Sequence, residues 1–344
     1  MAADADVTRS DLRFHRPNQT GVGRDDVLRA VDAAIQVFEE VGDEAGLARA
    51  LTLGGKVRLW GGEAAVALQE FERAARYARD AGDRPQEAES LRYLCTAMRS
   101  GPMPVDEALR RLDAISSRAV NNRRLDVALL AIRARFAAMQ GRLDDARDLG
   151  SQATALAEGH GLDTHLDSAV GEVELLVGDA EAAERVLRPM CEELERIGEL
   201  GFLSSVVPYL IDALHRQGRD QEALLLSERW RPERLTVAED ADAQVGWRRA
   251  RAKALAGTGA LDEAIRVARE ATAIAARTDY LDLRGQAAAD LGEVLRLAGS
   301  PQEAAAALAE ALSLYDEKGN LVAAERLRAV LAAPTADVQR APGL

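Results

Sequence analysis

The sequence predicts an all-α protein, an α-solenoid (superhelix) of about seven helical hairpins. Three observations lead to this prediction. A short frame, in which alanine follows glycine by five residues, recurs along the 344-residue chain. Aromatic residues make up only 4% of the chain while Ala, Leu, Arg and Glu are abundant, a mixture that favours helices over sheets. Hydrophobic residues amount to 47%, which is enough for a sizeable core.

The recurring frame is expected to mark the turn inside each hairpin. The glycine ends the first helix, because it adopts the left-handed conformation without steric cost. The alanine allows the two antiparallel helices to approach closely, and apolar residues four and seven positions later lie on the same face. In one stretched copy Gly101 precedes Ala108 by seven residues. The turn alanines are spaced 37 to 41 residues apart, at positions 67, 108, 146, 183, 223, 264 and 304.

The elements follow one another in a simple order. Residues 24–41 predict one unpaired helix before the first full repeat, and residues 321–332 predict a terminal capping helix. Residues 1–23 and 334–344 lack apolar periodicity and are expected to be disordered tails. Because the composition between them never shifts as it would at a linker, residues 24–333 are expected to form one continuous solenoid, in which stacked hairpins bury each other's apolar stripes.

This frame resembles the tetratricopeptide (TPR) repeat in a lengthened form, with a period of about 40 residues instead of the usual ~34. The Leu-Gly pair of the first TPR helix occurs at Leu291–Gly292 and Leu53–Gly54. Other copies have lost this pair, and the late proline of the TPR pattern is absent, so the individual copies are degenerate. HEAT repeats share the longer period and are the alternative; the glycine–alanine frame favours the TPR resemblance.

Several copies resemble a more specific context. The segments FEEVGDEAGLARAL, GEVELLVGDAEAAERVLR and DYLDLRGQAAADLGEVLRLAG are similar to the C-terminal part of large bacterial signalling proteins. Those proteins combine a class III adenylate/guanylate cyclase domain, an AAA-type ATPase module and a TPR-like region, and the similarity covers about residues 24 to 333. The resemblance implies a regulatory interaction module. It leaves open whether the chain acts alone or as a segment of a larger protein.

Charge and hydropathy argue against several classes of function. A net charge of −13 should repel phosphate, so nucleic acid is not an expected partner. No run approaches the ~18 apolar residues of a membrane span, and the acidic N-terminus lacks the apolar segment of a signal peptide, so we expect a cytoplasmic protein with no membrane partner. Cys95 and Cys191 lie far apart within helical patterns and are expected to be buried, reduced thiols.

No motif carries the spacing of a catalytic or metal site. The segment Gly54–Lys56 lacks both the leading glycine and the following hydroxyl residue of a phosphate-binding loop. His160 and His165 do not have the i, i+4 spacing of a helical metal site, and the clustered glutamates are typical of solvated helix faces. We therefore expect no enzymatic activity and no cofactor.

The TPR resemblance implies a binding site on the concave groove, which the first helix of each repeat lines in TPR arrays. The glycine frame carries the groove positions onto seven charged or titratable residues of this chain: Arg135, Glu172, Asp212, His215, Lys253, Glu293 and Arg296. Arg249, one turn before Lys253, is an eighth candidate groove residue. Because their signs alternate, we expect a protein or peptide partner, or another domain of a parent protein, rather than a clamp for one carboxylate.

Two alternatives stay open at this stage. Arg249, Lys253, Asp290 and Glu293 are equally compatible with an ion-pair ladder between repeats. The chain is also compatible with a small-ligand-sensing domain of a transcription regulator or signalling ATPase, which a pocketed, aromatic-lined groove would favour. Trp60, Trp230 and Trp247 are either recognition anchors or packing residues at junctions between repeats.

Overall fold

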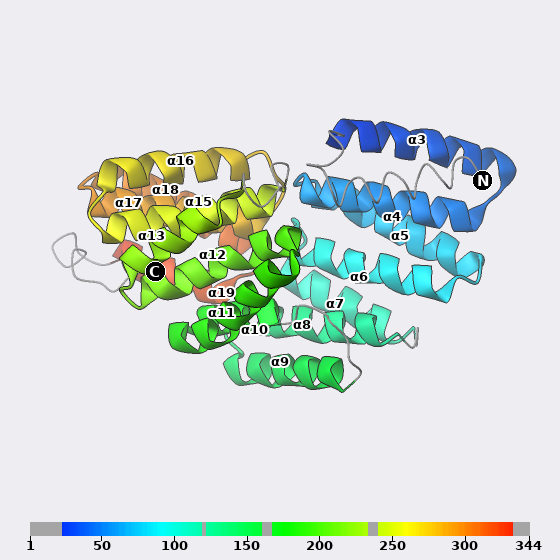
Figure 1. Ribbon diagram of the computed structural model, residues 1–344, viewed down its shortest axis with the longest axis horizontal. Helices are drawn as coiled ribbons and strands as arrows, with labels where there is room; N and C mark the ends of the chain where they lie inside the picture. The colour runs from blue at the N-terminus through cyan, green and yellow to red at the C-terminus, as the bar shows by residue number, and fades with distance from the viewer. Residues whose placement is uncertain (1–22, 119–121, 160–166, 233–239, 333–344) are drawn as a thin grey trace.

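The computed structural model describes residues 23–118, 122–159, 167–232 and 240–332, and it confirms the all-α solenoid (Figure 1). Within these ranges there are sixteen α-helices and no strand. The predicted terminal tails, apart from Gly23, and the histidines at 160 and 165 lie outside the described residues. In chain order the helices are α3 (Arg24–Val41), α4 (Glu44–Trp60), α5 (Ala64–Asp80), α6 (Arg84–Ser100), α7 (Val105–Ser116), α8 (Arg123–Met139), α9 (Leu143–Glu158), α10 (Asp167–Val177), α11 (Ala180–Ile197), α12 (Leu200–Arg216), α13 (Asp220–Arg229), α15 (Ala241–Gly257), α16 (Leu261–Ala275), α17 (Leu281–Leu297), α18 (Pro301–Lys318) and α19 (Leu321–Ala332).

The seven copies of the frame fold as seven helical hairpins, α4–α5, α6–α7, α8–α9, α10–α11, α12–α13, α15–α16 and α17–α18. The first helices of successive hairpins contact one another along the array. The predicted bounds 24–41 and 321–332 coincide with α3 and α19. Helix α3 buries Val31 and Phe38 against α4, and α19 buries Leu327 next to α17 and α18, so the two helices cover the ends of the apolar core.

The turn frame behaves as its chemistry predicts. All seven turn alanines are at most 3% exposed. Six of the seven turn glycines have a positive φ, between 73° and 99°. The exception is Gly101 of the stretched copy, which has φ −78° and ψ −168° and is followed by Pro102. Helix α6 therefore ends without the left-handed turn that closes the other first helices.

The array curves until its last hairpin meets its first ones, and it leaves the N- and C-terminal halves in contact (Figure 1). One core cluster contains Leu59, Met98 and Phe136 from the first hairpins together with Tyr280 and Leu283 from the last. Helix α17 contacts α6, and α19 contacts α8. We refer to these contacts between α4–α8 and the segment from Thr278 to α19 as the closure interface.

Two further sequence expectations concern single side chains and hydropathy. Cys95 and Cys191 are both free and buried, and burial raises the pKa of each thiol to about 12. Among the described helices none is long and apolar enough to cross a membrane.

The structure also places two of the three tryptophans. Trp230 and Trp247 are buried, and their indole N–H groups donate to Glu195 and to the carbonyl of Ser227, respectively. Both are therefore packing residues between hairpins.

The turn frame makes a prediction for two glycines that face open space. A Cβ added to Gly218 or to Gly201 meets no atom within 4 Å, but only Gly218 has a positive φ, of 73°. Gly218→Ala is therefore expected to destabilise the fold by about 1 kcal/mol, because it forces an L-residue into the left-handed region. Gly201→Ala, inside α12, is expected to stabilise it by about 0.5 kcal/mol. Urea unfolding midpoints check both; equal effects of the two substitutions would contradict the turn assignment.

Candidate functional site

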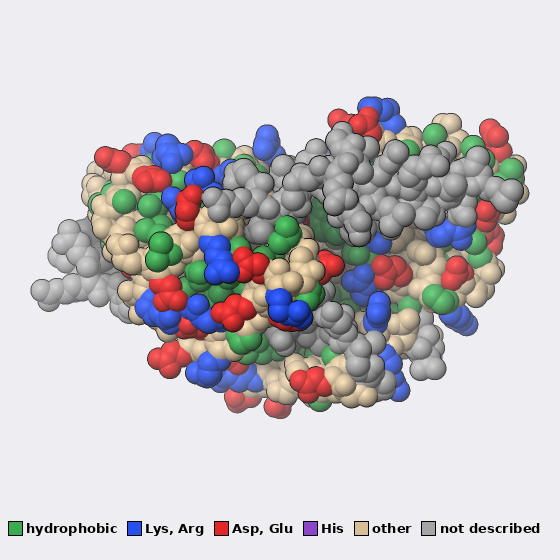
Figure 2. Space-filling model, in the orientation of Figure 1, with side chains coloured by type: hydrophobic (Ala, Val, Ile, Leu, Met, Phe, Trp, Pro, Cys, Tyr) green, Lys and Arg blue, Asp and Glu red, His purple; other side chains and the backbone are tan. Residues whose placement is uncertain are grey.

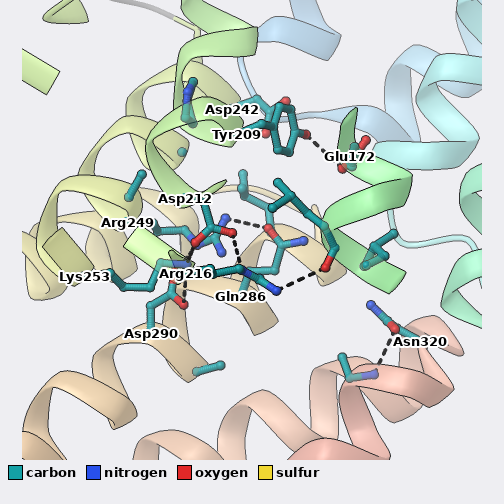
Figure 3. A pocket seen from close by; sticks show the side chains of 18 of the residues that line it. Glu172, Tyr209, Asp212, Arg216, Asp242, Arg249, Lys253, Gln286, Asp290 and Asn320 are labelled. Atoms are coloured by element: carbon teal, nitrogen blue, oxygen red, sulfur yellow. Dashed lines mark hydrogen bonds and ion pairs between the residues drawn. The ribbon is translucent and has the colours of Figure 1, made fainter. Parts of the chain in front are cut away.

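A cavity of about 130 Å³ lies on the concave side of the C-terminal half (Figure 3). Its walls are formed by the first helices α10, α12, α15 and α17, and α18, α19 and Asn320 complete it. The lining is mixed, with apolar residues such as Leu175, Pro208 and Ala289 beside charged residues from each first helix. The concave surface therefore presents ionisable side chains in a confined space, where electrostatic interactions are stronger than on the outer surface.

Asp212 of α12 is at the centre of one cluster of charges in the cavity. Its carboxylate pairs with Lys253 of α15, and Arg216, one helical turn further along α12, lies 3.0 Å from it. Burial alone would raise the pKa of Asp212, but the charges of Arg216 and Lys253 outweigh this effect and hold the pKa below its usual value of 3.8. Asp212 is therefore held in its ionised form by two cations.

A ladder of ion pairs connects α15 to α17. Arg249 lies 2.8 Å from Asp290, and Lys253 lies 3.6 Å from the other oxygen of the same carboxylate. Lys253, only 4% exposed, thus bridges Asp212 and Asp290 across three successive first helices. Glu293, one turn beyond Asp290, is buried, and burial raises the pKa of its carboxyl. The ion-pair ladder that the sequence left open is present for Arg249, Lys253 and Asp290.

Arg135 of α8 connects the cavity to the closure interface. It is buried and pairs with Glu172 of α10 and, at 3.1 Å, with Asp282 at the start of α17. The remaining capacity of Asp282 is filled by Gln286 at 2.7 Å and Asn320 at 2.8 Å, both of which line the cavity. One buried carboxylate therefore joins three parts of the chain.

Two arginines cap the C-terminal end of α10 from opposite walls of the cavity. Arg216 donates to the carbonyl of Leu175 at 3.1 Å, and Arg326 of α19 donates to the carbonyl of Leu176 at 2.9 Å. Burial lowers the pKa of Arg326, and the positive charge of Arg216 lowers it further. Two guanidinium groups thus converge on the last carbonyls of α10 beside the cavity.

Comparison with known proteins addresses the fold. No family model and no curated protein matches this sequence. The solved structure of NprR in complex with its cognate peptide NprX aligns with 83% of this chain and 87% of NprR, with a TM-score of 0.56 and 12% identity. The fold is a TPR-like α-solenoid. Yeast Tom70 aligns with 92% of this chain and 63% of its own chain, at a TM-score of 0.47 and 14% identity. Apo NprR from B. thuringiensis aligns with 88% of this chain and 85% of its own, at a TM-score of 0.45 and 13% identity.

Of the eight predicted groove residues, four line the cavity and four lie elsewhere. Glu172, Asp212, Arg249 and Lys253 line the cavity. Arg135 and Glu293 are buried beside this network. His215 pairs with Asp220 at 2.6 Å, at the turn between α12 and α13. Arg296 lies in the last turn of α17 and is not among the lining residues.

Sequence reasoning missed other residues of the cavity. Arg216 follows Asp212 by four residues, so the i, i+4 spacing on one helix face would have identified it. Tyr315, Asn320 and Arg326 carry no such signal, because they reach the cavity only through the packing of α18 and α19. No group of three or more His, Cys, Asp or Glu side chains in the described ranges is arranged to hold a metal ion.

The Asp212 cluster predicts a matched pair of effects on stability. Asp212→Asn leaves Lys253 and Arg216 without their shared counter-charge and is expected to destabilise the fold by about 3 kcal/mol at pH 7. Asp316→Asn, which breaks an ion pair whose side chains are 45% and 50% exposed, is expected to change stability by less than about 0.5 kcal/mol.

The effect of Asp212→Asn also has a defined pH dependence. Because the pKa of Asp212 lies below 3.8 in the folded state, its contribution is present above that pH and is lost as the pH falls further. The difference between wild type and variant in urea unfolding should therefore be constant from pH 7 to about 5 and shrink under acid conditions. A difference that grows on acidification would contradict the assignment.

Proposed function

We propose that this chain is a protein-interaction module without catalytic activity, which binds a short peptide segment of a partner on the concave surface of α10–α19. The observation that carries the proposal is the convergence of Glu172, Asp212, Arg249 and Lys253, from three successive hairpins, on one cavity. Buried ion pairs rarely stabilise a fold more than apolar packing would, so charges concentrated at a concave cavity suggest a binding role. NprR, a solenoid of similar fold, has been solved in complex with a peptide.

The cavity also suggests which chemical group the partner supplies. Among the described lining residues, Arg216, Arg249 and Lys253 each have a carboxylate partner, whereas the hydrogen bond of Arg326 goes to a backbone carbonyl. A peptide carboxylate, from an acidic side chain or the C-terminus, would complete the charge pairing beside Arg326. The visible face in Figure 2 mixes both signs of charge instead of forming a basic stripe, in line with a peptide and not a nucleic acid as partner.

The cellular role of the module is a further part of this proposal. The resemblance to the helical region of cyclase–ATPase signalling proteins suggests a cytoplasmic regulatory role, in which occupancy of the groove is passed to a partner or to another domain. A second candidate is a sensor of small dipolar ligands. It is favoured by the small volume of the cavity and by Tyr209 and Tyr315 in its lining.

Panning the purified protein against a random heptapeptide library tests the proposal. We expect acidic peptides that bind with micromolar Kd in calorimetry, and a Kd at least about 10-fold weaker for Arg326→Ala, because a charge-assisted hydrogen bond is lost. Arg328→Ala is the matched control, since Arg328 is on the same helix but pairs with Asp316 at an exposed position.

The outcomes separate the two candidates. Equal affinity of the Arg326→Ala and Arg328→Ala variants for the selected peptide would contradict the site. Failure of all peptides, together with thermal stabilisation by free amino acids or dicarboxylates, would replace the peptide-binding module with the small-ligand sensor.

A further inference from the structure

The cavity is smaller than the site of a peptide should be. Its volume is about 130 Å³, whereas ligand pockets usually enclose roughly 300–1,000 Å³. The closed arrangement therefore admits one small polar group, and a peptide needs a wider groove. Of the walls, α10, α12 and α15 belong to consecutive hairpins in the middle of the array, while Tyr315, Asn320 and Arg326 belong to the last hairpin and its capping helix. Widening the cavity thus requires the last hairpin to move.

The last hairpin is held in place at the N-terminal end of α5. The carboxylate of Asp279 accepts hydrogen bonds from the backbone N–H groups of Ala64 and Ala65, at 2.9 and 2.7 Å. These are the first two residues of α5, whose own N-cap residue, Glu63, makes no side-chain cap hydrogen bond. The carboxylate thus serves as the N-cap of a helix more than 200 residues away in the sequence and interacts favourably with the positive end of its dipole.

The segment from Thr278 to Tyr280 also packs closely against the turn between α4 and α5. The amide of Asp279 donates to the carbonyl of Gly62 at 3.0 Å. A Cβ added to Gly62 would lie 2.5 Å from a methyl group of Thr278. The hydroxyl of Tyr280 donates to the carbonyl of Leu59. The turn before α17 therefore docks on the turn between α4 and α5 through backbone groups that only a tight contact brings together.

A second anchor lies at the C-terminal end of α6. Lys318, the last residue of α18 and fully buried, donates to the carbonyls of Met98, Gly101 and Met103, at 3.0, 2.7 and 2.9 Å. Three acceptors use all three N–H donors of the ammonium group. Gly101 is the one turn glycine without a positive φ, so Lys318 satisfies the Met98 carbonyl of the last turn of α6, which a left-handed turn would otherwise satisfy. Lys318 is thus a C-cap supplied from the other end of the chain.

The contacts of Asp279 and Lys318 are connected to the cavity through Asp282, and both contacts are polar. Asp282, three residues after Asp279, joins Arg135 to Gln286 and Asn320, two of the cavity residues. Burial lowers the pKa of Lys318 to about 7, which means that the contact is made at the expense of desolvating its charge. Water can replace the hydrogen bonds to Asp279 and Lys318 when the interface opens. The apolar contacts of the core cluster around Met98 and Phe136 oppose opening, so the open state is the minor one.

We propose that the closure interface is an autoinhibitory contact: while Asp279 and Lys318 cap α5 and α6, the groove is closed to peptides, and release of α17–α19 from these helix ends opens it. The binding half of this proposal depends on the proposed function, whereas the closure half does not. If the open state is a minor one, the apparent affinity for peptide is reduced by the fraction of molecules that are open.

A reversible covalent lock tests the proposal directly. A Cβ added to Gly319 would lie 3.6 Å from the Cβ of Val105 across the closure interface, which is within the usual range of a disulfide. Because Gly319 has φ 81°, a cysteine there is strained, but the strain is present in the oxidised and the reduced form alike and cancels in their comparison. In the V105C/G319C double variant, oxidation is expected to weaken binding of the panned acidic peptide at least 10-fold, and reduction with dithiothreitol to restore it. The same protein serves as its own folding control, and Cys95 and Cys191 stay outside the exchange because they are buried. Equal affinity in the oxidised and reduced forms would overturn the proposal.

A second measurement requires no peptide. Asp279→Asn combined with Lys318→Met, at pH 6.5, is expected to increase the radius of gyration in small-angle X-ray scattering while helical circular dichroism is retained. Asp83→Asn and Lys56→Met are the matched controls, because Asp83 caps its own helix α6 and Lys56 pairs with Glu89 within the N-terminal half. Neither control substitution should increase the radius of gyration. A folded double variant with unchanged scattering would overturn the closure half. Absence of peptide binding by the reduced V105C/G319C protein would instead count against the proposed function.

Discussion

The arrangement of this solenoid depends on two helix ends that are capped by residues from the far end of the chain. A helix leaves its first N–H groups and its last carbonyls without partners, and most helices solve this with neighbouring residues. Here α5 relies on Asp279 and α6 relies on Lys318. An acidic group at the positive end of one helix and a basic group at the negative end of the next bring the last hairpin against the first ones. In this closed arrangement Arg326 of α19 reaches the end of α10 and completes the lining of the cavity.

The repeats themselves were predictable because their determinants are local. Glycine at each turn, alanine five residues later and apolar residues on one face define the hairpins whatever the rest of the chain does, and the helices at 24–41 and 321–332 have the predicted bounds. Four of the eight predicted groove residues line the cavity, and whether any of the eight binds a partner stays a prediction. What the sequence could not reveal is non-local. The longer spacing to Ala108 and the following Pro102 mark Gly101 as different, and a proline favours an extended residue before it. The donor to its carbonyl, Lys318, lies more than 200 residues later and has no signal in the sequence. Asn320 and Arg326 reach the cavity through the same closure.

The charges on the concave side have two roles that the structure combines. Arg249, Lys253 and Asp290 form a ladder that ties neighbouring hairpins together, and the same side chains line the cavity. Ion pairs that connect repeats would be disturbed if the repeats moved apart, so binding in the groove and the curvature of the array are physically coupled. This coupling explains why an opening at one end, near Asp282, would be felt by Gln286 and Asn320 in the cavity wall.

Hydrogen exchange of the first amides of α5 tests the central claim most directly. If Asp279 caps this helix in solution, the amides of Ala64 and Ala65 exchange far more slowly than those at the start of α9, where the N-cap residue Arg142 makes no side-chain cap hydrogen bond. The account predicts protection of both amides in the wild type and its loss in Asp279→Asn, with α5 still helical. Exchange of Ala64 and Ala65 in the wild type as fast as that of Leu143 and Asp144 would contradict it.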